Sequence, residues 1–420
     1  MASTQHHNCS FCGRPIRQAA HFLRGVNASI CDACIEQAHA ILQVENGGEA
    51  CIKKQPAASP AAAPAAFSVD NLQLRRPYEI KAFLDQYVIG QDEAKKYLAV
   101  AVYNHYKRIR QSDADLQEVE IEKSNIIMVG DTGTGKTLLA RTIARMLNLP
   151  FAIVDATVLT EAGYVGEDVE SILTRLLQAS DYNVAAAEKG IIFIDEIDKI
   201  TRKSDNPSIT RDVSGEGVQQ ALLKLLEGSV VNVPPQGGRK HPDQKMVPVN
   251  TKDILFIAGG AFEGIDRIIA RRVNKNMIGF NAIEKLNRVD KNDLLRYVAP
   301  ADLRHFGLIP EIVGRLPVLT YLAPLDKAAL RRILTEPKNA IVKQYTKLFA
   351  MDKVELQLDE EALDYIVDLA LKHKLGARGL RSICEELLID AMYELPENGQ
   401  EQQLRITREY AERQLAQEVI

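Results

Sequence analysis

The sequence predicts three parts: a small four-cysteine module, an α/β core with a doubly wound parallel sheet, and a smaller, mainly α-helical C-terminal domain. Two Cys-x-x-Cys pairs lie near the N-terminus, and helical periodicity dominates after about Pro324. Between them, apolar strand-like runs alternate with helical patterns, around Ile126, Ile153, Ile192 and Leu255. We expect the boundaries at 1–50 for the zinc-binding module, 51–67 for an Ala/Pro-rich linker, 68–319 for the large domain and 320–420 for the small domain.

The strongest motif is a glycine-rich loop at residues 130–137, GDTGTGKT, which fits G-x-x-x-x-G-K-[ST]. A strand-like run at 125–129 precedes it and a helical pattern at 138–147 follows, which argues against the alternative of a plain glycine-rich turn. Backbone N–H groups of such a loop surround phosphates. We expect Lys136 to reach the β- and γ-phosphates and Thr137 to ligate Mg²⁺. The candidate contacts with a nucleoside triphosphate are Asp131, Thr132, Gly133, Thr134, Gly135, Lys136, Thr137 and Leu138.

A second part of this site follows the apolar run at 191–194, which is typical of a parallel strand buried on both faces. The run ends in Asp195 and Glu196. We expect Asp195 to hold Mg²⁺ and Glu196 to activate a water molecule as general base. The alternative is a strand that ends in two solvated acids. After a phosphate-binding loop at this distance, hydrolysis is the better interpretation; Asp198 is assigned no role.

Four of the six cysteines form two close pairs, Cys9 with Cys12 and Cys31 with Cys34. This spacing is typical of a four-thiolate zinc site, in which each pair contributes one knuckle. Disulfides are the alternative, but a cytosolic protein keeps its thiols reduced. So small a module lacks a core of its own, so we expect zinc binding to supply its folding energy.

Composition excludes several classes of protein. The chain has 420 residues, 46% of them hydrophobic, and a net charge of −4. An acidic balance argues against a protein whose main task is to coat nucleic acid. No run approaches the ~18–20 apolar residues of a membrane span. The start lacks the regions of a signal peptide, so we expect no membrane association and a cytoplasmic location.

Helical patterns complete the coarse layout. In the core we expect helices at Lys95–Ile109 and about Val213–Glu227. In the C-terminal domain we expect helices at Lys327–Met351, Glu360–His373 and Arg378–Glu394, with short strands at Val354–Leu358 and Leu404–Ile406. The alanine- and proline-rich run at 55–66 is typical of a semi-extended tether.

With both nucleotide motifs, the cysteine module and the helical tail, the chain closely resembles the ClpX family of AAA+ protein unfoldases over essentially its whole length. The resemblance implies an AAA+ P-loop ATPase core that uses ATP with Mg²⁺, a zinc-binding N-terminal module and a homohexameric ring. It also implies unfolding and translocation of tagged protein substrates, some delivered by adaptors, into a ClpP-type peptidase, with stand-alone unfoldase activity. The chain contains neither G-x-S-x-G nor H-E-x-x-H, so proteolysis belongs to a partner.

The resemblance assigns further residues. Val88 and Ile89 lie in the segment that packs on adenine, Arg315 corresponds to the arginine finger, and Arg378 to the second sensor. A finger given to a neighbour's ATP requires a ring. The substrate pore is assigned to Tyr164 and Val165, to the charged loop Arg239, Lys240 and His241, and to a second loop at 202–211. Peptidase docking is assigned to Ile278, Gly279 and Phe280.

Other interpretations remain open. Without the family resemblance, Tyr164 would be interpreted as a core tyrosine. Arg315 or Arg378 would be interpreted as part of a surface ion pair. Asp131 stands where the family usually has proline, and the run at 254–258 ends in two glycines, so no first-sensor residue is named. The rival function is a nucleic-acid motor or loader whose zinc module reads DNA. Residues 1–50 form no basic patch, because three arginines face four acids, Asp32, Glu36, Glu45 and Glu49.

Overall fold

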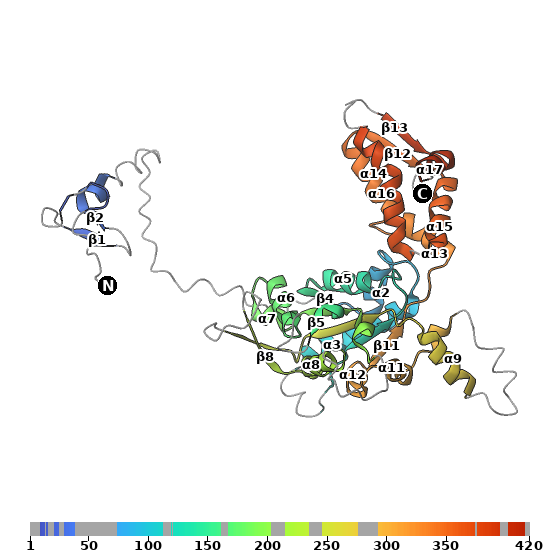
Figure 1. Ribbon diagram of the computed structural model, residues 1–420, viewed down its shortest axis with the longest axis horizontal. Helices are drawn as coiled ribbons and strands as arrows, with labels where there is room; N and C mark the ends of the chain where they lie inside the picture. The colour runs from blue at the N-terminus through green and yellow to red at the C-terminus, as the bar shows by residue number, and fades with distance from the viewer. Residues whose placement is uncertain are drawn as a thin grey trace. The chain divides into compact units, whose positions relative to one another are not determined.

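The computed structural model describes residues 9–12, 14–15, 21–24, 29–37, 74–111, 119, 121–160, 167–202, 215–234, 246–275, 293–373, 376–394 and 402–415. The chain divides into two compact units between Ala65 and Ala66, and each is described by itself (Figure 1). Several predicted features lie outside the described residues: the linker at 51–67, the pore residues Tyr164, Val165, Arg239, Lys240 and His241, and the docking residues Ile278, Gly279 and Phe280. These assignments stay predictions.

The first unit contains an antiparallel pair of short strands, β1 (Phe22–Arg24) and β2 (Ser29–Cys31). A helical turn at 32–37 follows β2 directly. Cys9 and Cys31 are buried, whereas the large apolar side chains of Phe11 and Leu23 are exposed. The described part of the unit therefore closes around its cysteines.

The second unit is built on a parallel sheet of five strands in the order β11-β3-β10-β7-β4. Their bounds are β3 (Ile126–Val129), β4 (Phe151–Asp155), β7 (Ile191–Asp195), β10 (Leu255–Gly260) and β11 (Val318–Tyr321). The first four confirm the strands predicted from their apolar runs. The edge strand β11 was not predicted, and it crosses the predicted domain boundary at residue 319.

Both faces of this sheet are covered, as the doubly wound prediction requires. Ile126 and Met128 pack with α2 (Pro77–Asp85), α3 (Asp92–Ile109) and α5 (Lys136–Leu147). Ile127 and Val129 point to the opposite face. That face packs against α6 (Ser171–Ala179), α8 (Glu216–Glu227), α9 (Ile265–Lys275), α11 (Pro300–Phe306) and α12 (Pro310–Arg315).

Shorter elements complete the large domain. They are η3 (Ala156–Val158), β5 (Leu159–Thr160), β6 (Glu167–Asp168), α7 (Val184–Ala187), η4 (Ile197–Ile200), β8 (Val230–Val233), β9 (Val247–Asn250) and η5 (Leu294–Tyr297). Strands β5 and β6 pair in parallel, and β8 and β9 pair antiparallel. None of the described helices is both long and apolar enough to cross a membrane.

The small domain, orange to red in Figure 1, has a separate core. It contains α13 (Lys327–Thr335), α14 (Ile341–Met351), β12 (Val354–Leu358), α15 (Glu360–Lys372), α16 (Gly376–Glu394), β13 (Gln402–Ile406) and α17 (Arg408–Leu415). The prediction of one helix over Lys327–Met351 is wrong, because the chain breaks at Pro337. Proline lacks an N–H group and its ring clashes with the preceding turn.

Hydrogen bonds at two points join the large and small domains through one short segment. The side-chain amide of Gln91 accepts a hydrogen bond from the N–H of Ala323 and donates one to its carbonyl, both at 2.8 Å. The N–H of Lys338 donates to the carbonyl of Gln86, also at 2.8 Å. Residues 86–91 therefore hold the chain both where it leaves the sheet and between α13 and α14.

Candidate nucleotide site and zinc site

The carboxyl ends of three neighbouring strands bring the predicted nucleotide motifs together. The glycine-rich loop follows β3, the Asp195–Glu196 pair ends β7, and two glycines end β10. In parallel sheets, ligands bind at this edge, where the loops after adjacent strands meet. Residues more than 120 positions apart along the sequence thus face one site.

The loop after β3 is held by bonds to its own backbone. Lys136, the first residue of α5, donates from Nζ to the carbonyls of Gly130 at 2.5 Å and Asp131 at 2.9 Å. The hydroxyl of Thr134 donates to the carbonyl of Asp131 at 2.7 Å. Burial lowers the pKa of Lys136, and the nearby carboxylates of Asp195 and Asp198 oppose that shift. The loop thus presents a buried ammonium group between backbone turns.

A glycine at the end of β10 makes room for this lysine. A Cβ atom at Gly259 would lie 2.8 Å from the ring of Phe193 and 3.5 Å from Cδ of Lys136. Any larger residue would therefore displace a packed ring.

Thr137, Asp195 and Glu196 form the hydrolytic side of the site. The Thr137 hydroxyl donates to Oδ2 of Asp195 at 3.0 Å, and the Glu196 N–H donates to Oδ1 at 3.0 Å. Glu196 has a φ of 55°, a left-handed conformation that costs a non-glycine residue about 1 kcal/mol. Strain of this kind concentrates at functional sites. Here it turns the chain sharply after β7, with the carboxylate of Glu196 exposed to the cavity.

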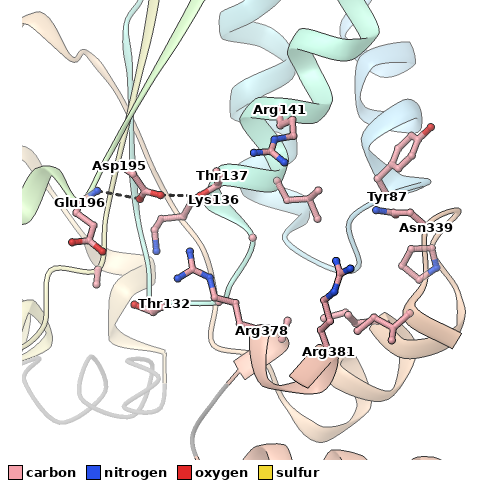
Figure 2. A pocket seen from close by; sticks show the side chains of 18 of the residues that line it. Tyr87, Thr132, Lys136, Thr137, Arg141, Asp195, Glu196, Asn339, Arg378 and Arg381 are labelled. Atoms are coloured by element: carbon pink, nitrogen blue, oxygen red, sulfur yellow. Dashed lines mark hydrogen bonds between the residues drawn. The ribbon is translucent and has the colours of Figure 1, made fainter. Parts of the chain in front are cut away.

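These side chains line one wall of a cavity of about 660 Å³, a size within the range of roughly 300–1,000 Å³ for small-molecule sites. In Figure 2, Asp195 and Glu196 lie toward one side and Tyr87 and Asn339 toward the other. The large domain contributes Tyr87, Thr132, Gly133, Gly135, Lys136, Thr137, Leu138, Arg141, Asp195, Glu196, Asp198, Lys199, Ala261 and Glu263. The small domain contributes Ile333, Pro337, Asn339, Ile341, Gln344, Ala377, Arg378 and Arg381.

The first turn of α16 approaches the glycine-rich loop closely. Gly376 has a φ of +58°, and a Cβ atom there would lie 3.2 Å from the carbonyl oxygen of Thr132. Arg378 extends from the same turn into the cavity (Figure 2). The cavity therefore has walls from two domains, and one ligand can contact both.

Four of the predicted nucleotide contacts do not line this cavity. Val88 and Ile89 are buried behind it, with a Val88 methyl 3.9 Å from a Cβ atom placed at Gly135. Thr134 is buried within the loop, and Asp131 is exposed. The side chain that reaches the cavity from the 87–91 segment is Tyr87. Val88 and Ile89 lie behind the residues that line the cavity, and their assignment to adenine stays a prediction.

Arg315 lies outside the cavity of its own chain. It ends α12, with half of its side chain exposed, and pairs with Glu227 at 3.0 Å. Exposed pairs of this kind contribute about 0–1 kcal/mol to stability. The guanidinium group therefore remains accessible from outside the chain.

Sequence reasoning missed Asp198, to which it assigned no role. Its side chain is buried and accepts a hydrogen bond from the N–H of Ala261 at 3.1 Å. It thus connects the end of β7 to the end of β10. Nothing in the sequence around Asp198 indicated that its side chain is buried or that it pairs with Ala261.

Other cavity residues differ in how far the sequence indicated them. Arg141 follows Thr137 by four residues, and Arg381 follows Arg378 by three, so helical spacing places each pair on one face. Asn339, Ile341 and Gln344 gave no such signal. Their position depends on how the small domain packs beside the large one.

In the first unit, the thiols of Cys9, Cys12, Cys31 and Cys34 all lie within 4.8 Å of one another. Cys9 and Cys34 are 4.0 Å apart, and Cys12 and Cys31 are 3.6 Å apart. Tetrahedral zinc with bonds of about 2.3 Å places its sulfurs roughly 3.8 Å apart. The four thiols are therefore gathered closely enough to bind one zinc ion after small shifts of their side chains.

Comparisons with known proteins agree with both sites. Three family descriptions match: a ClpX C4-type zinc finger at residues 7–44, an AAA domain of the Cdc48 subfamily at 121–319, and the C-terminal, D2-small domain of ClpB protein at 325–407. An AAA domain makes the chain an ATPase, and the zinc finger supports Zn²⁺ at the four cysteines.

Curated relatives match nearly the whole chain, and each is named ATP-dependent Clp protease ATP-binding subunit ClpX. The protein of Bacteroides fragilis is 64% identical over 97% of this chain and 95% of its own length. That of Bacteroides thetaiotaomicron is 63% identical with the same coverage, and that of Porphyromonas gingivalis is 61% identical over 97% of this chain and 96% of its own. The chain therefore belongs to the ClpX family of AAA+ ATPases.

Proposed function

We propose that this protein hydrolyses ATP in a homohexameric ring to unfold tagged proteins and translocate them into a ClpP-type peptidase, and that it also unfolds proteins without the peptidase. One observation carries the proposal. The residues suited to hydrolysis and an arginine of the small domain, Arg378, line a single cavity. A change in the nucleotide then changes the contacts between two domains, which is how a chemical step moves protein.

The chemistry follows from the wall formed by the large domain. The Thr137 hydroxyl and the Asp195 carboxylate offer adjacent hard oxygen ligands, 3.0 Å apart, and would hold Mg²⁺. The metal would neutralise charge on the β- and γ-phosphates. Lys136 supplies a cation to the same phosphates once its hydrogen bonds to Gly130 and Asp131 exchange for phosphate oxygens. Glu196 takes the proton of the attacking water.

Two arginines complete the proposed mechanism from different directions. Arg315 cannot reach the cavity of its own chain, so it serves the ATP of a neighbouring subunit. An arginine in this position neutralises charge in the transition state. Arg378 contacts the γ-phosphate within its own subunit, and loss of that phosphate frees α16 from the glycine-rich loop.

Substrate handling rests on the family and on the names of its relatives. Tyr164 and Val165 would grip the polypeptide in the pore, and Arg239, Lys240 and His241 would attract its charged end. Ile278, Gly279 and Phe280 would dock on the peptidase. The zinc modules would recruit substrates and adaptors, in the cytoplasm, where thiolate ligands stay reduced.

The test is ATP-dependent loss of fluorescence from a stable fluorescent protein that carries an unstructured tag, with the ClpP-type peptidase present. Wild type abolishes the fluorescence, and so does Glu122→Gln, a matched change of an exposed glutamate outside the cavity. Glu196→Gln leaves the fluorescence unchanged although it still binds ATP. Omission of the peptidase tests stand-alone unfolding.

Persistent fluorescence with wild type, despite normal ATP turnover, would contradict the proposal. The rival function, a nucleic-acid motor, then predicts that DNA stimulates the turnover. It also predicts DNA binding that weakens steeply with salt.

A further inference from the structure

Three arginines line the nucleotide cavity, beside the carboxylates of Asp195, Glu196, Asp198 and Glu263. Arg141 comes from α5 of the large domain, whereas Arg378 and Arg381 come from the first two turns of α16. All three are exposed, and none makes a hydrogen bond or ion pair within the described ranges. Like charges around one cavity repel one another. A ligand with several negative charges would relieve that repulsion.

The positions of the lining residues in the cavity suggest where the base and each phosphate of a bound nucleotide would lie. In Figure 2, Asp195, Glu196 and Lys136 lie on one side and Tyr87 and Asn339 on the other, and the guanidinium groups of Arg141 and Arg381 extend between them. A nucleotide whose β- and γ-phosphates meet Lys136 therefore points its base toward Tyr87. Its α-phosphate lies in the interval between.

Helical geometry agrees with this placement. Arg141 lies one turn, about 5.4 Å, beyond Thr137 along α5, on the same face. Arg381 lies one turn beyond Arg378 along α16. Each helix thus presents one residue to the terminal phosphates and a second, one turn later, to the next part of the ligand.

We propose that Arg141 and Arg381 together bind the α-phosphate, so that they hold ADP and ATP alike and bridge the two domains in both states. Of these three arginines, Arg378 is the one that contacts the γ-phosphate and so distinguishes ATP from ADP. The inference rests on the proposed position of ATP in this cavity. It follows that ADP, the product, keeps the domains connected until it dissociates.

The test compares affinities of the full chain for ADP and for ATPγS, a slowly hydrolysed analogue, by titration calorimetry. We expect Arg141→Ala and Arg381→Ala each to weaken both nucleotides by the same factor, roughly tenfold, the loss of one charge-assisted hydrogen bond. Arg381→Lys, which keeps the charge, recovers part of that loss. Arg304→Ala, a control at an exposed arginine of α11 that does not line the cavity, binds as wild type does.

Adenosine, added as a competitor, distinguishes the contribution of the phosphates to binding from the contribution of the base. We expect wild type and both alanine variants to bind it equally. Unchanged ADP affinity in both variants, a loss confined to ATPγS, or an equal loss for adenosine would each overturn the inference. A wild-type chain that binds neither nucleotide would instead overturn the proposed position of ATP. Unchanged melting temperatures without nucleotide verify that the variants are folded.

Discussion

Two groups of basic side chains lie at opposite ends of the strands of the same sheet. At the amino ends of the strands, Arg108 donates to Asp253 at 2.9 Å and Lys123 donates to the carbonyl of Thr251 at 2.8 Å. His105 lies in the same group, 3.0 Å from the carbonyl of Asp253. At the carboxyl ends, the arginines of the cavity are exposed and have no such partners among the described residues.

This difference distinguishes basic side chains that stabilise the fold from basic side chains that are available to bind a ligand. Burial lowers the pKa of His105 to about 3, so this ring stays neutral and packs like a core residue. Buried cations are costly unless paired, and the amino-end group finds its partners in the turn before β10. The cavity arginines remain solvated until a ligand arrives. Burial and partners, more than residue type, distinguish the two roles.

Arg315 is the hardest case for this distinction, since it is exposed yet paired with Glu227. We expect Arg315→Ala to lower ATP turnover roughly 10³-fold, because an arginine finger stabilises charge in the transition state. Steady-state hydrolysis measures it. Glu227→Gln removes the same ion pair but keeps the arginine, and should retain turnover. Equal losses in the two variants would show that the pair itself matters and that Arg315 is structural.

The next largest effect is expected when one arginine is removed from each group. We expect Arg108→Ala to lower the free energy of unfolding by about 2 kcal/mol, because its buried side chain loses its hydrogen bonds to the Asp253 carboxylate and the Lys252 carbonyl. Its ADP affinity should not change. Arg141→Ala should do the reverse. Chemical denaturation and calorimetry on both variants measure the two quantities, and a variant that lost both would break the comparison.

The pH dependence of stability tests Lys123. Burial lowers its pKa to about 7, whereas an unfolded lysine titrates near 10.4. Between these values the unfolded chain binds more protons, so the unfolding free energy of wild type rises with pH. Lys123→Met lacks this contribution, so the stability of the variant relative to wild type should fall by about 3 kcal/mol between about pH 7 and pH 10.

Unfolding curves across that range measure the effect. Lys107→Met, at an exposed position of α3, is the control and should follow wild type. A parallel pH profile for Lys123→Met would mean that the ammonium group keeps its charge at the amino edge.

The four thiolates form a third polar cluster, and their removal should affect hydrolysis least. A chelator should remove about one zinc ion per chain and unfold the first unit, because metal binding supplies its folding energy. ATP turnover should change less than about twofold, since the cavity belongs to a separate compact unit. Cys12→Ser should also lose zinc, whereas Cys384→Ser, a buried cysteine of α16, should keep it. A large fall in turnover on chelation would contradict this independence.

Local motifs were predictable from the sequence, and contacts between domains were not. Lys136, Thr137, Asp195 and Glu196 sit next to apolar strands, so their meeting at one edge follows from a parallel sheet. Proline at position 337 signalled the break between α13 and α14, but the strong helical periodicity on either side obscured it. The edge strand β11 includes Thr320 and is mostly half-buried, so it lacks the continuous apolar run that marks β3, a strand of the same length.

The candidate site divides in the same way. Arg141 and Arg381 share helix faces with predicted residues, so spacing alone could have indicated them. Asn339 and Gln344 reach the cavity only because the small domain folds beside the large one, which no local pattern encodes. The pore and docking residues stay predictions based on resemblance.

The two connections at residues 86–91 act like the two hinges of a door. Gln91 holds Ala323 and Gln86 holds Lys338, and two fixed points define an axis. Rotation about that axis moves nearby groups little and distant groups far. Tyr87 lies on the segment that carries both points, whereas Arg378 lines the cavity on the side of Lys136. In the proposed mechanism Arg378 contacts the γ-phosphate, so its removal would act on the small domain at a distance from this axis and would rotate the domain about it.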